Sequence, residues 1–150
     1  MLNVVLFEPE IPPNTGNIAR LCGATNTKLY LKHPLGFSLD NKYLKRAGLD
    51  YWNFIDIEEI NSLKILWNKF PKASFYYLST KSKNIYTNTS FKNGDFLVFG
   101  PESRGLPEEL IMGNSNALNI PMKNNHIRSL NLANSVSIVL FEALRQLKFL

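Results

Sequence analysis

The amino-acid sequence predicts an α/β fold built on a parallel β-sheet. Short, almost wholly apolar runs recur along the 150 residues, and segments with helical spacing of apolar residues separate them. Apolar runs without alternation are typical of parallel strands that helices cover on both faces. No linker-like or low-complexity stretch interrupts this order. We therefore expect one domain, residues 1–150, with its functional loops at the carboxyl ends of the strands.

The first half of the chain begins with a predicted βαβ unit. Residues 2–7 form the first apolar run and lead into a segment with three prolines. Residues 14–24 then have helical spacing, with Asn14 or Thr15 suited to cap the start, and residues 28–31 form the second strand. The remaining elements expected in this half are a helix at 40–47, a strand at 53–57, a helix at 58–70 and a strand at 74–78.

The second half contains a loop framed by glycine and proline. A strand at 95–99 ends in this loop, residues 99–107, where Glu102, Ser103 and Arg104 lie between two glycines. Small residues let a ligand approach the backbone closely; the alternative is a rigid surface turn with ordinary charges. The elements expected after it are a short helix at 107–112, a strand at 117–122 stopped by Pro121, and a final helix at 132–148 capped by Asn131.

The final helix is apolar around more of its circumference than one buried face requires. Ile138 and Phe141 widen a stripe of apolar residues that already has helical spacing. Such a helix needs a second surface to cover it, so we infer a dimer contact. The alternative is deep burial of the helix within one monomer.

Composition excludes several classes of protein. Cys22 is the single cysteine, which excludes an internal disulfide framework, and with two histidines it leaves no convincing zinc site. No apolar run has the length needed to span a bilayer. We therefore expect a cytoplasmic, metal-free protein without a membrane partner.

The chain is basic, which favours a polyanionic partner. Its net charge is +5, and counterion release favours the binding of basic proteins to nucleic acid. Lysines and arginines gather in loops that are suited to grip phosphates, although each is as well explained as a solvated charge. Asn14, Asn17 and Arg20 are spaced by three residues, so we expect them on one side of their helix. His33 has no ligand-type neighbours at metal spacing and is interpreted as structural or adjacent to RNA.

Three segments together resemble the motifs of the SPOUT superfamily of RNA methyltransferases. They are residues 14–20 (NTGNIAR), residues 99–107 (FGPESRGLP), and residues 120–122 with 128–136 (IPM and RSLNLANSV). The chain is most similar to the minimal members, the tRNA (cytidine/uridine-34) 2′-O-methyltransferases, which methylate the ribose of the wobble nucleotide.

The resemblance implies a fold, a cofactor and partners. The fold is a parallel-sheet SPOUT (α/β knot) fold with a deep trefoil knot at the carboxyl terminus. The methyl donor is S-adenosyl-L-methionine, the substrate is tRNA, and the enzyme is a homodimer with active sites near its interface; no DNA partner is expected. By the same resemblance, the donor is bound by Leu78, Ser79, Thr80, Gly100, Glu102, Gly105, Ile120, Met122, Ser129 and Leu130.

The resemblance also implies the residues around the reacting hydroxyl. These are Asn14, Arg20, Glu102, Ser129 and Asn131, and the residues suited to contact RNA are Arg20, Lys42, Lys45, Arg46, Lys81, Arg104 and Arg128. The proton acceptor stays open. Arg20 is the usual candidate in the family, yet a guanidinium loses its proton only above about pH 12, so we expect it to bind a phosphate and stabilise the developing alkoxide. Glu102 is the competing base, unless it orients Arg104 or a backbone amide.

Two other functions compete with this one. A non-catalytic RNA-binding factor would keep the same fold and basic surface, but all five polar positions around the hydroxyl are present. A ribosomal RNA methyltransferase of the same fold usually carries an additional RNA-binding domain, for which 150 residues leave no room. The sequence does not distinguish which tRNA or wobble base is used, because contacts to phosphate carry little sequence information.

Overall fold

The computed structural model of the chain describes residues 1–149, except for the side chains of Lys45 and of residues 47–50. Six parallel strands form one sheet in the order β3-β2-β1-β5-β4-β6. The strands are β1 (Asn3–Phe7), β2 (Lys28–Lys32), β3 (Ile57–Ile60), β4 (Phe75–Leu78), β5 (Phe96–Phe99) and β6 (Ala117–Leu118). The helices are α1 (Pro12–Ala24), α2 (Lys42–Gly48), α3 (Leu63–Lys69), α4 (Glu108–Ile111) and α5 (Leu132–Gln146), with 3-10 turns η1 (Leu49–Phe54) and η2 (Tyr86–Asn88).

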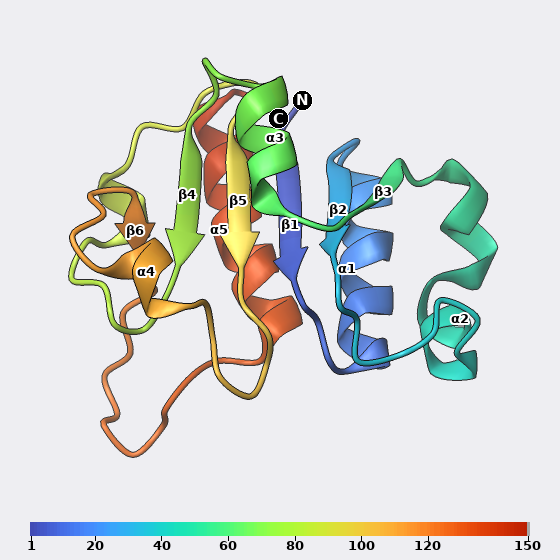
Figure 1. Cartoon of the computed structure of the whole chain (residues 1–150). Coiled ribbons are helices and arrows are strands. Elements are labelled where there is room, and N and C mark those ends of the chain that lie inside the picture. The colour runs from blue at the N-terminus through green and yellow to red at the C-terminus, as the bar shows by residue number, and fades with distance from the viewer. Residues whose placement is uncertain (150) are drawn as a thin grey trace.

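Helices cover both faces of the sheet, as the apolar strands predict. Figure 1 shows α3 in front of the sheet and α1 and α5 behind it. In β1, Val4 and Leu6 pack into the apolar cluster that contains α1 and α5, whereas Val5 and Phe7 pack into the cluster that contains α3. Alternate residues of one strand therefore enter two separate cores, which explains why the run shows no polar alternation.

The sequence prediction was wrong between residues 53 and 62. The expected strand at 53–57 and helix at 58–70 are instead η1, the strand β3 and a shorter helix α3. Lys28 Nζ lies 2.9 Å from Glu58 Oε2, and His33 Nε2 lies 2.7 Å from Glu59 Oε1, so both acidic residues of β3 have partners on or just after the neighbouring strand β2. The Ser62 side chain then accepts a hydrogen bond from the Lys64 amide and caps α3.

Helix α1 begins two residues earlier than expected. Pro12 and Pro13 occupy its first turn, where the missing N–H groups cost nothing. Neither Asn14 nor Thr15 is the cap; the N-cap residue is Ile11, which has no side-chain acceptor. The N–H groups of Asn14 and Thr15 donate to the Ile11 carbonyl, and the N–H of Ile11 itself has an acceptor from elsewhere in the chain, as described below.

The carboxyl-terminal elements follow the prediction with shorter bounds. The strand β6 has two residues, and helix α5 ends at Gln146. The Asn131 side chain accepts a hydrogen bond from the Asn134 amide at 3.2 Å, which confirms Asn131 as the cap of α5. Most of the wide apolar stripe of α5 is buried within the monomer, but Phe141 is 47% exposed and Ile138 only partly covered. No helix in residues 1–149 is long and apolar enough to cross a membrane.

Candidate functional site

A pocket of about 320 Å³ opens where the carboxyl ends of the parallel strands meet. Its walls come from the loops after β1, β4, β5 and β6 and from the first turn of α5. Because parallel strands all end at the same edge of the sheet, segments far apart in sequence meet there. The lining residues are Ile11, Asn14, Leu78, Ser79, Thr80, Phe99, Gly100, Pro101, Glu102, Asn119, Ile120, Met122, Ser129, Leu130, Asn131, Leu132 and Ser135.

Most of the predicted site residues line this pocket. All residues predicted to bind the donor line the pocket except Gly105. All residues predicted to surround the hydroxyl line the pocket except Arg20. The basic residues predicted to contact RNA lie away from the lining as well, and the side chain of Lys45 lies outside the described part of the structure.

The two glycines of the loop after β5 pack against each other. A Cβ atom on Gly100 would lie 2.4 Å from the Leu106 nitrogen and 2.8 Å from the Gly105 Cα. Gly105 has φ +72°, a conformation that other residues adopt at a cost. The loop is therefore folded tightly on itself. Gly105 supports the position of Gly100, and its contact with the donor, which the resemblance implies, stays a prediction.

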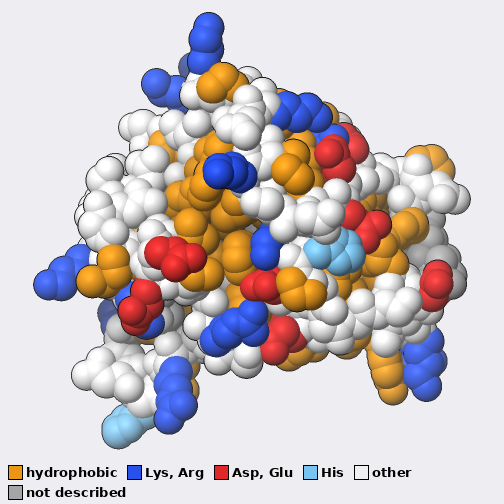
Figure 2. Space-filling view, in the orientation of Figure 1, with side chains coloured by type: hydrophobic (Ala, Val, Ile, Leu, Met, Phe, Trp, Pro, Cys, Tyr) orange, Lys and Arg blue, Asp and Glu red, His pale blue; other side chains and the backbone are white. Residues whose placement is uncertain are grey.

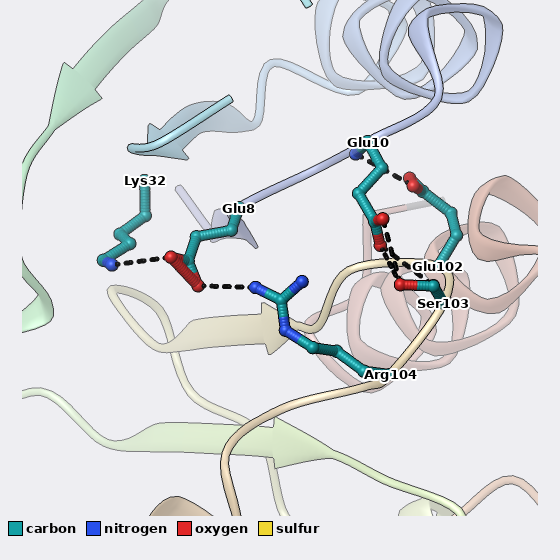
Figure 3. A network of polar contacts seen from close by, with 6 residues as sticks. All are labelled: Glu8, Glu10, Lys32, Glu102, Ser103 and Arg104. Carbon is teal, nitrogen blue, oxygen red and sulfur yellow. Dashed lines mark hydrogen bonds and ion pairs between the residues drawn. The ribbon is translucent and has the colours of Figure 1, made fainter. Parts of the chain in front are cut away.

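Two carboxylates tie this loop to the segment after β1 (Figure 3). Glu102 Oε2 accepts hydrogen bonds from the backbone N–H groups of Glu10 at 2.9 Å and Ile11 at 3.0 Å. In return, the Glu10 carboxylate accepts from the backbone N–H of Ser103 at 3.0 Å and from its hydroxyl at 2.7 Å. We call Glu10, Glu102 and Ser103 the carboxylate clasp. Its hydrogen bonds from Ser103 lower the pKa of Glu10 below its ordinary value.

Glu102 thus supplies the missing cap of helix α1. Ile11 is the N-cap residue, and its N–H is one of the two that Glu102 holds. The second carboxylate oxygen, Oε1, is buried and has no hydrogen-bond partner among the described residues, yet Glu102 lines the pocket. A buried charged oxygen without a donor is costly, so its place at the pocket is suited to a ligand that supplies one.

Arg104 points away from Glu102. Its Nη2 atom donates to Glu8 Oε2 at 3.1 Å, and Lys32 Nζ lies 3.5 Å from the other oxygen of the same carboxylate (Figure 3). The alternative in which Glu102 orients Arg104 is therefore wrong, and the alternative in which it orients backbone amides is correct. Arg104 is engaged in an ion pair at the outer side of the loop.

Asn14 and Asn131 join the first and third motifs. The Asn131 side-chain amide donates to Asn14 Oδ1 at 3.1 Å, while its own Oδ1 caps α5. The Asn14 side chain is 8% exposed and lines the pocket. Asn131 therefore has the structural role of a cap and a place in the pocket wall at once, as the sequence allows.

Arg20 lies on a different side of α1 from Asn14. Asn17 and Arg20 are exposed, so the expectation that all three share one side is wrong. Each three-residue step along a helix falls short of a full turn, and two steps carry the third residue away from the first. The Arg20 guanidinium lies over the ring of Tyr51, 5.1 Å from its centre.

The basic side chains do not gather into one field on the face shown in Figure 2. They are scattered over it, some at its outline and some near its centre, with acidic and hydrophobic groups between them. Lys81 donates to Glu108 at 3.1 Å, and both side chains are well exposed. The described residues hold no group of three or more His, Cys, Asp or Glu side chains suited to bind a metal ion. Burial raises the pKa of Cys22 to about 12, which makes its thiol unreactive at neutral pH.

Some lining residues escaped the sequence analysis. Ile11, Pro101, Leu132 and Ser135 lie beside predicted positions, and Ser135 is one helical turn after Asn131, a spacing that would have revealed it. Glu10 was missed because its role depends on a contact between two loops, for which a single sequence carries no signal.

Comparison with known proteins points in one direction. A profile of the SpoU rRNA Methylase family matches residues 1–141. A tRNA (cytidine(34)-2'-O)-methyltransferase of Saccharophagus degradans is 48% identical over 157 residues, covering 99% of this chain and 97% of the relative.

Solved structures agree with this. One, described as "Structural insights into the 2-OH methylation of C/U34 on tRNA", superposes with a TM-score of 0.93 at 44% identity and covers 100% of this chain and 98% of its own. An AdoMet-bound rRNA methyltransferase of Sinorhizobium meliloti superposes with a TM-score of 0.85 at 27% identity, covering 97% of this chain and 56% of its own.

Proposed function

The chain belongs to the SpoU rRNA Methylase family, and from this premise we propose that it transfers a methyl group from S-adenosylmethionine to the ribose 2′-oxygen of nucleotide 34 of tRNA. The observation that carries the proposal is the pocket: its walls come from the three motif segments, in a chain 48% identical over nearly its whole length to a relative with that name. A tRNA substrate and the single Cys22 together support a cytoplasmic location.

The pocket fits the methyl donor. Leu78, Ile120 and Leu130 supply apolar surface for a planar base, which is how such pockets hold most of a ligand's area. Polar lining residues lie among them, and the buried Glu102 Oε1 has a lone pair available for a donor group. S-adenosylmethionine carries hydroxyl and ammonium donors and a net positive charge near its sulfur, so a carboxylate in the wall matches its chemistry.

The residues of this chain then position the reacting groups. When bound, the donor supplies an electrophilic methyl on a sulfonium that leaves as a neutral sulfide, so alignment and removal of a proton are the remaining difficulties. Two backbone N–H groups donate to Glu102 Oε2 and fix the orientation of the carboxylate. We propose that Glu102 Oε1 accepts a hydrogen bond inside the pocket, and that the Asn14–Asn131 pair fixes the facing wall.

Arg20 acts from a second copy of the chain in this proposal. Arg20 is exposed and lies outside the pocket of its own chain. The pocket of a single chain therefore lacks the guanidinium that the family pattern places at the hydroxyl. Exposed apolar side chains at the start of α1 (Ile11, 44%) and on α5 (Phe141, 47%) support a homodimer that covers these two helices. Arg20 then stabilises the negative charge that develops on the 2′-oxygen as this oxygen bonds to the methyl carbon and the carbon–sulfur bond breaks, and Glu102, the competing base, takes the proton.

A mixing experiment tests this arrangement. Arg20→Ala and Glu102→Gln are each expected to be inactive alone. If Arg20 acts across a two-fold interface, equal amounts of the two variants, exchanged into mixed dimers, regain about a quarter of wild-type activity, because half the dimers are mixed and each has one complete site. If both residues act within one chain, the mixture stays inactive.

We also propose the deep trefoil knot that the resemblance implies. Support comes from the meeting of the loop after β5 and the segment from β6 to α5 at the pocket, since residues of both line it. Stretching the chain by its two ends in a single-molecule experiment tests the knot: a knotted chain stays shorter than its full contour length, whereas an unknotted one reaches it.

The reaction itself is tested with purified protein, labelled donor and bulk tRNA, followed by digestion and mass identification of the modified nucleoside. We expect 2′-O-methylated nucleoside from position 34. A tRNA with a 2′-deoxy nucleotide at that position is the matched substrate control and should take up no label. A product methylated on a base would contradict the assignment, and binding of RNA without any transfer would favour a non-catalytic factor.

A further inference from the structure

Three aromatic side chains project from the segment formed by α2 and η1. Tyr43 is 48% exposed, Tyr51 is 46% exposed and Phe54 is 84% exposed, the last being the most exposed large hydrophobic side chain among the described residues. Exposing so much aromatic surface is unfavourable in water unless another molecule covers it. We call Tyr43, Tyr51 and Phe54 the aromatic platform.

Cations accompany these rings. The Arg20 guanidinium lies 5.1 Å from the centre of the Tyr51 ring, and Lys42 Nζ lies 5.1 Å from the centre of the Tyr43 ring. Residues 42–54 contain three basic residues and one acidic residue. At the corner where Figure 1 places α2, Figure 2 shows hydrophobic and basic side chains that project next to each other.

This combination selects one class of partner. Aromatic rings offer stacking surface to any base, while lysine and arginine bind the phosphates between bases, and proteins that hold unpaired nucleic acid combine the two. A protein that covered these aromatic rings through apolar contacts would gain little from the excess of positive charge beside them. The chemistry therefore matches unpaired RNA nucleotides.

The platform also lies toward the edge of the molecule at which the strands end and the pocket opens. In Figure 1, α2 lies level with the loops at the carboxyl ends of the strands, where the pocket opens. Arg20 connects the platform to the pocket of the second copy in the proposed dimer, because it contacts Tyr51 and is the residue proposed to act there at the reacting ribose. A ribose that enters a pocket must leave the base stack of its strand, which frees the neighbouring bases to stack on protein rings.

We propose that the aromatic platform stacks unpaired bases next to the nucleotide that is methylated. The inference rests on the proposed function, since it assigns a second binding surface to the same RNA. Phe54 is the sharpest probe, because its change leaves the Arg20–Tyr51 contact in place. Tyr51 has two roles here, as a stacking ring and as a positioning residue for Arg20.

The test uses the full chain and an RNA stem-loop with an unpaired loop of seven nucleotides, of about the size of an anticodon loop, with 2-aminopurine next to the target position. Stacking on protein rings changes the fluorescence of that base. We expect Phe54→Leu to weaken RNA binding about tenfold, the scale of one lost base–ring stack. The fluorescence change should shrink, and donor affinity should stay as in the wild type.

Salt dependence separates stacking from charge. Phe54→Leu should leave the slope of log affinity against log salt unchanged, whereas Lys42→Met should lower it by about one if that lysine contacts a phosphate. Tyr51→Phe should keep affinity and turnover, and Tyr51→Leu should lose both. Ile65→Ala and Met112→Ala remove exposed apolar side chains outside α2 and η1 and are the matched controls, with no expected effect on RNA binding.

The outcomes distinguish this inference from the proposed function. If Phe54→Leu and Tyr51→Leu bind RNA with the affinity of the wild type and give the same fluorescence change, the platform is overturned, even if the wild type methylates ribose. A wild type that transfers no methyl to ribose, with RNA affinity that still falls in Phe54→Leu, would overturn the function and support the platform. Dissociation of a dimer by Phe54→Leu, measured by light scattering, would assign the rings to an interface between copies of the chain and overturn the inference.

Discussion

The two walls of the pocket are held in different ways. The wall formed by the loops after β1 and β5 is fixed by the carboxylate clasp and by the tight packing of Gly100 on Gly105. The second wall is the end of the segment 123–130, whose Ser129 and Leu130 line the pocket, and this segment is exposed throughout. Hydrogen bonds within this segment are local: the Ile127 amide donates to the Asn124 carbonyl, and the His126 amide donates to the Asn124 side-chain oxygen.

This difference indicates which wall of the pocket is preorganised before a ligand binds. Hydrogen bonds between loops fix the first wall at no cost to binding, because the chain has already lost that conformational freedom on folding. The second wall has few contacts of its own, so donor, RNA or a second copy of the chain must supply them. Substitutions in the first wall should therefore change stability, and those in the second should change ligand binding.

Gly100→Ala should have the largest effect on the first wall. Its Cβ would lie 2.4 Å from the Leu106 nitrogen, a backbone atom that cannot move without opening the loop. We expect a loss of about 3 kcal/mol in the free energy of unfolding, the upper part of the range for overpacking. Chemical denaturation measures it. Gly94→Ala, with φ +89° and open space around the Cβ, is the matched control for a glycine whose cost comes only from its backbone conformation.

Glu102→Ala should come next, with a loss of about 2 kcal/mol, because two backbone N–H groups at the start of α1 lose their acceptor. Glu102→Gln separates the two oxygens. Its carbonyl oxygen can still accept both N–H groups, so stability should stay within about 1 kcal/mol of the wild type.

The amide of that variant would replace the buried Oε1, so donor binding or turnover should fall although the protein stays folded. Calorimetric titration with S-adenosylmethionine and denaturation are the two measurements. Full activity in Glu102→Gln would show that this carboxylate needs no negative charge.

Glu10→Gln should have a smaller, pH-dependent effect. The hydrogen bonds from Ser103 lower the pKa of Glu10 in the folded protein, so its contribution to stability is present above the ordinary pKa of 4.5 and is lost as the pH falls through the lower, folded value. The wild type should be more stable than Glu10→Gln by less than about 1 kcal/mol at pH 7, because the side chain is only partly buried. The difference should vanish in acid. An equal difference at pH 7 and at pH 3 would contradict a charged clasp.

Ser129→Ala should affect stability least. Ser129 is exposed and lines the second wall, so the free energy of unfolding should change by less than about 0.5 kcal/mol. Donor affinity should fall about fivefold, the scale of one hydrogen bond. A stability loss as large as that of Glu102→Ala would mean that the two walls are equally preformed.

The sequence predicted the parts of the fold that depend on local pattern. Apolar runs located β1, β2, β4 and β5, and Asn131 was correctly predicted as the cap of α5. The pattern failed at Glu58 and Glu59, whose composition suits a helix but whose partners, Lys28 and His33, place them in a strand. These contacts between residues nearly thirty positions apart in the sequence override the local propensity of the two glutamates for a helix.

The lining residues that belong to the three motif segments could be predicted from the sequence. The pocket is lined by residues of all three segments, although their roles stay predictions. What a single sequence could not supply is orientation: that Arg20 leaves the pocket of its own chain, that Arg104 pairs with Glu8, and that Glu10 and Glu102 exchange hydrogen bonds across two loops.

The borrowed cap of α1 has a consequence for the order in which the protein is made. The helix lies near the start of the chain, yet Glu102, which accepts the N–H groups of the two residues just before the helix, follows Glu10 by 92 residues. A ribosome that synthesises the chain from its amino terminus releases α1 long before that carboxylate exists. During synthesis the start of α1 therefore remains uncapped, and this end of the helix is completed only when the loop after β5 emerges and closes one wall of the pocket in the same step.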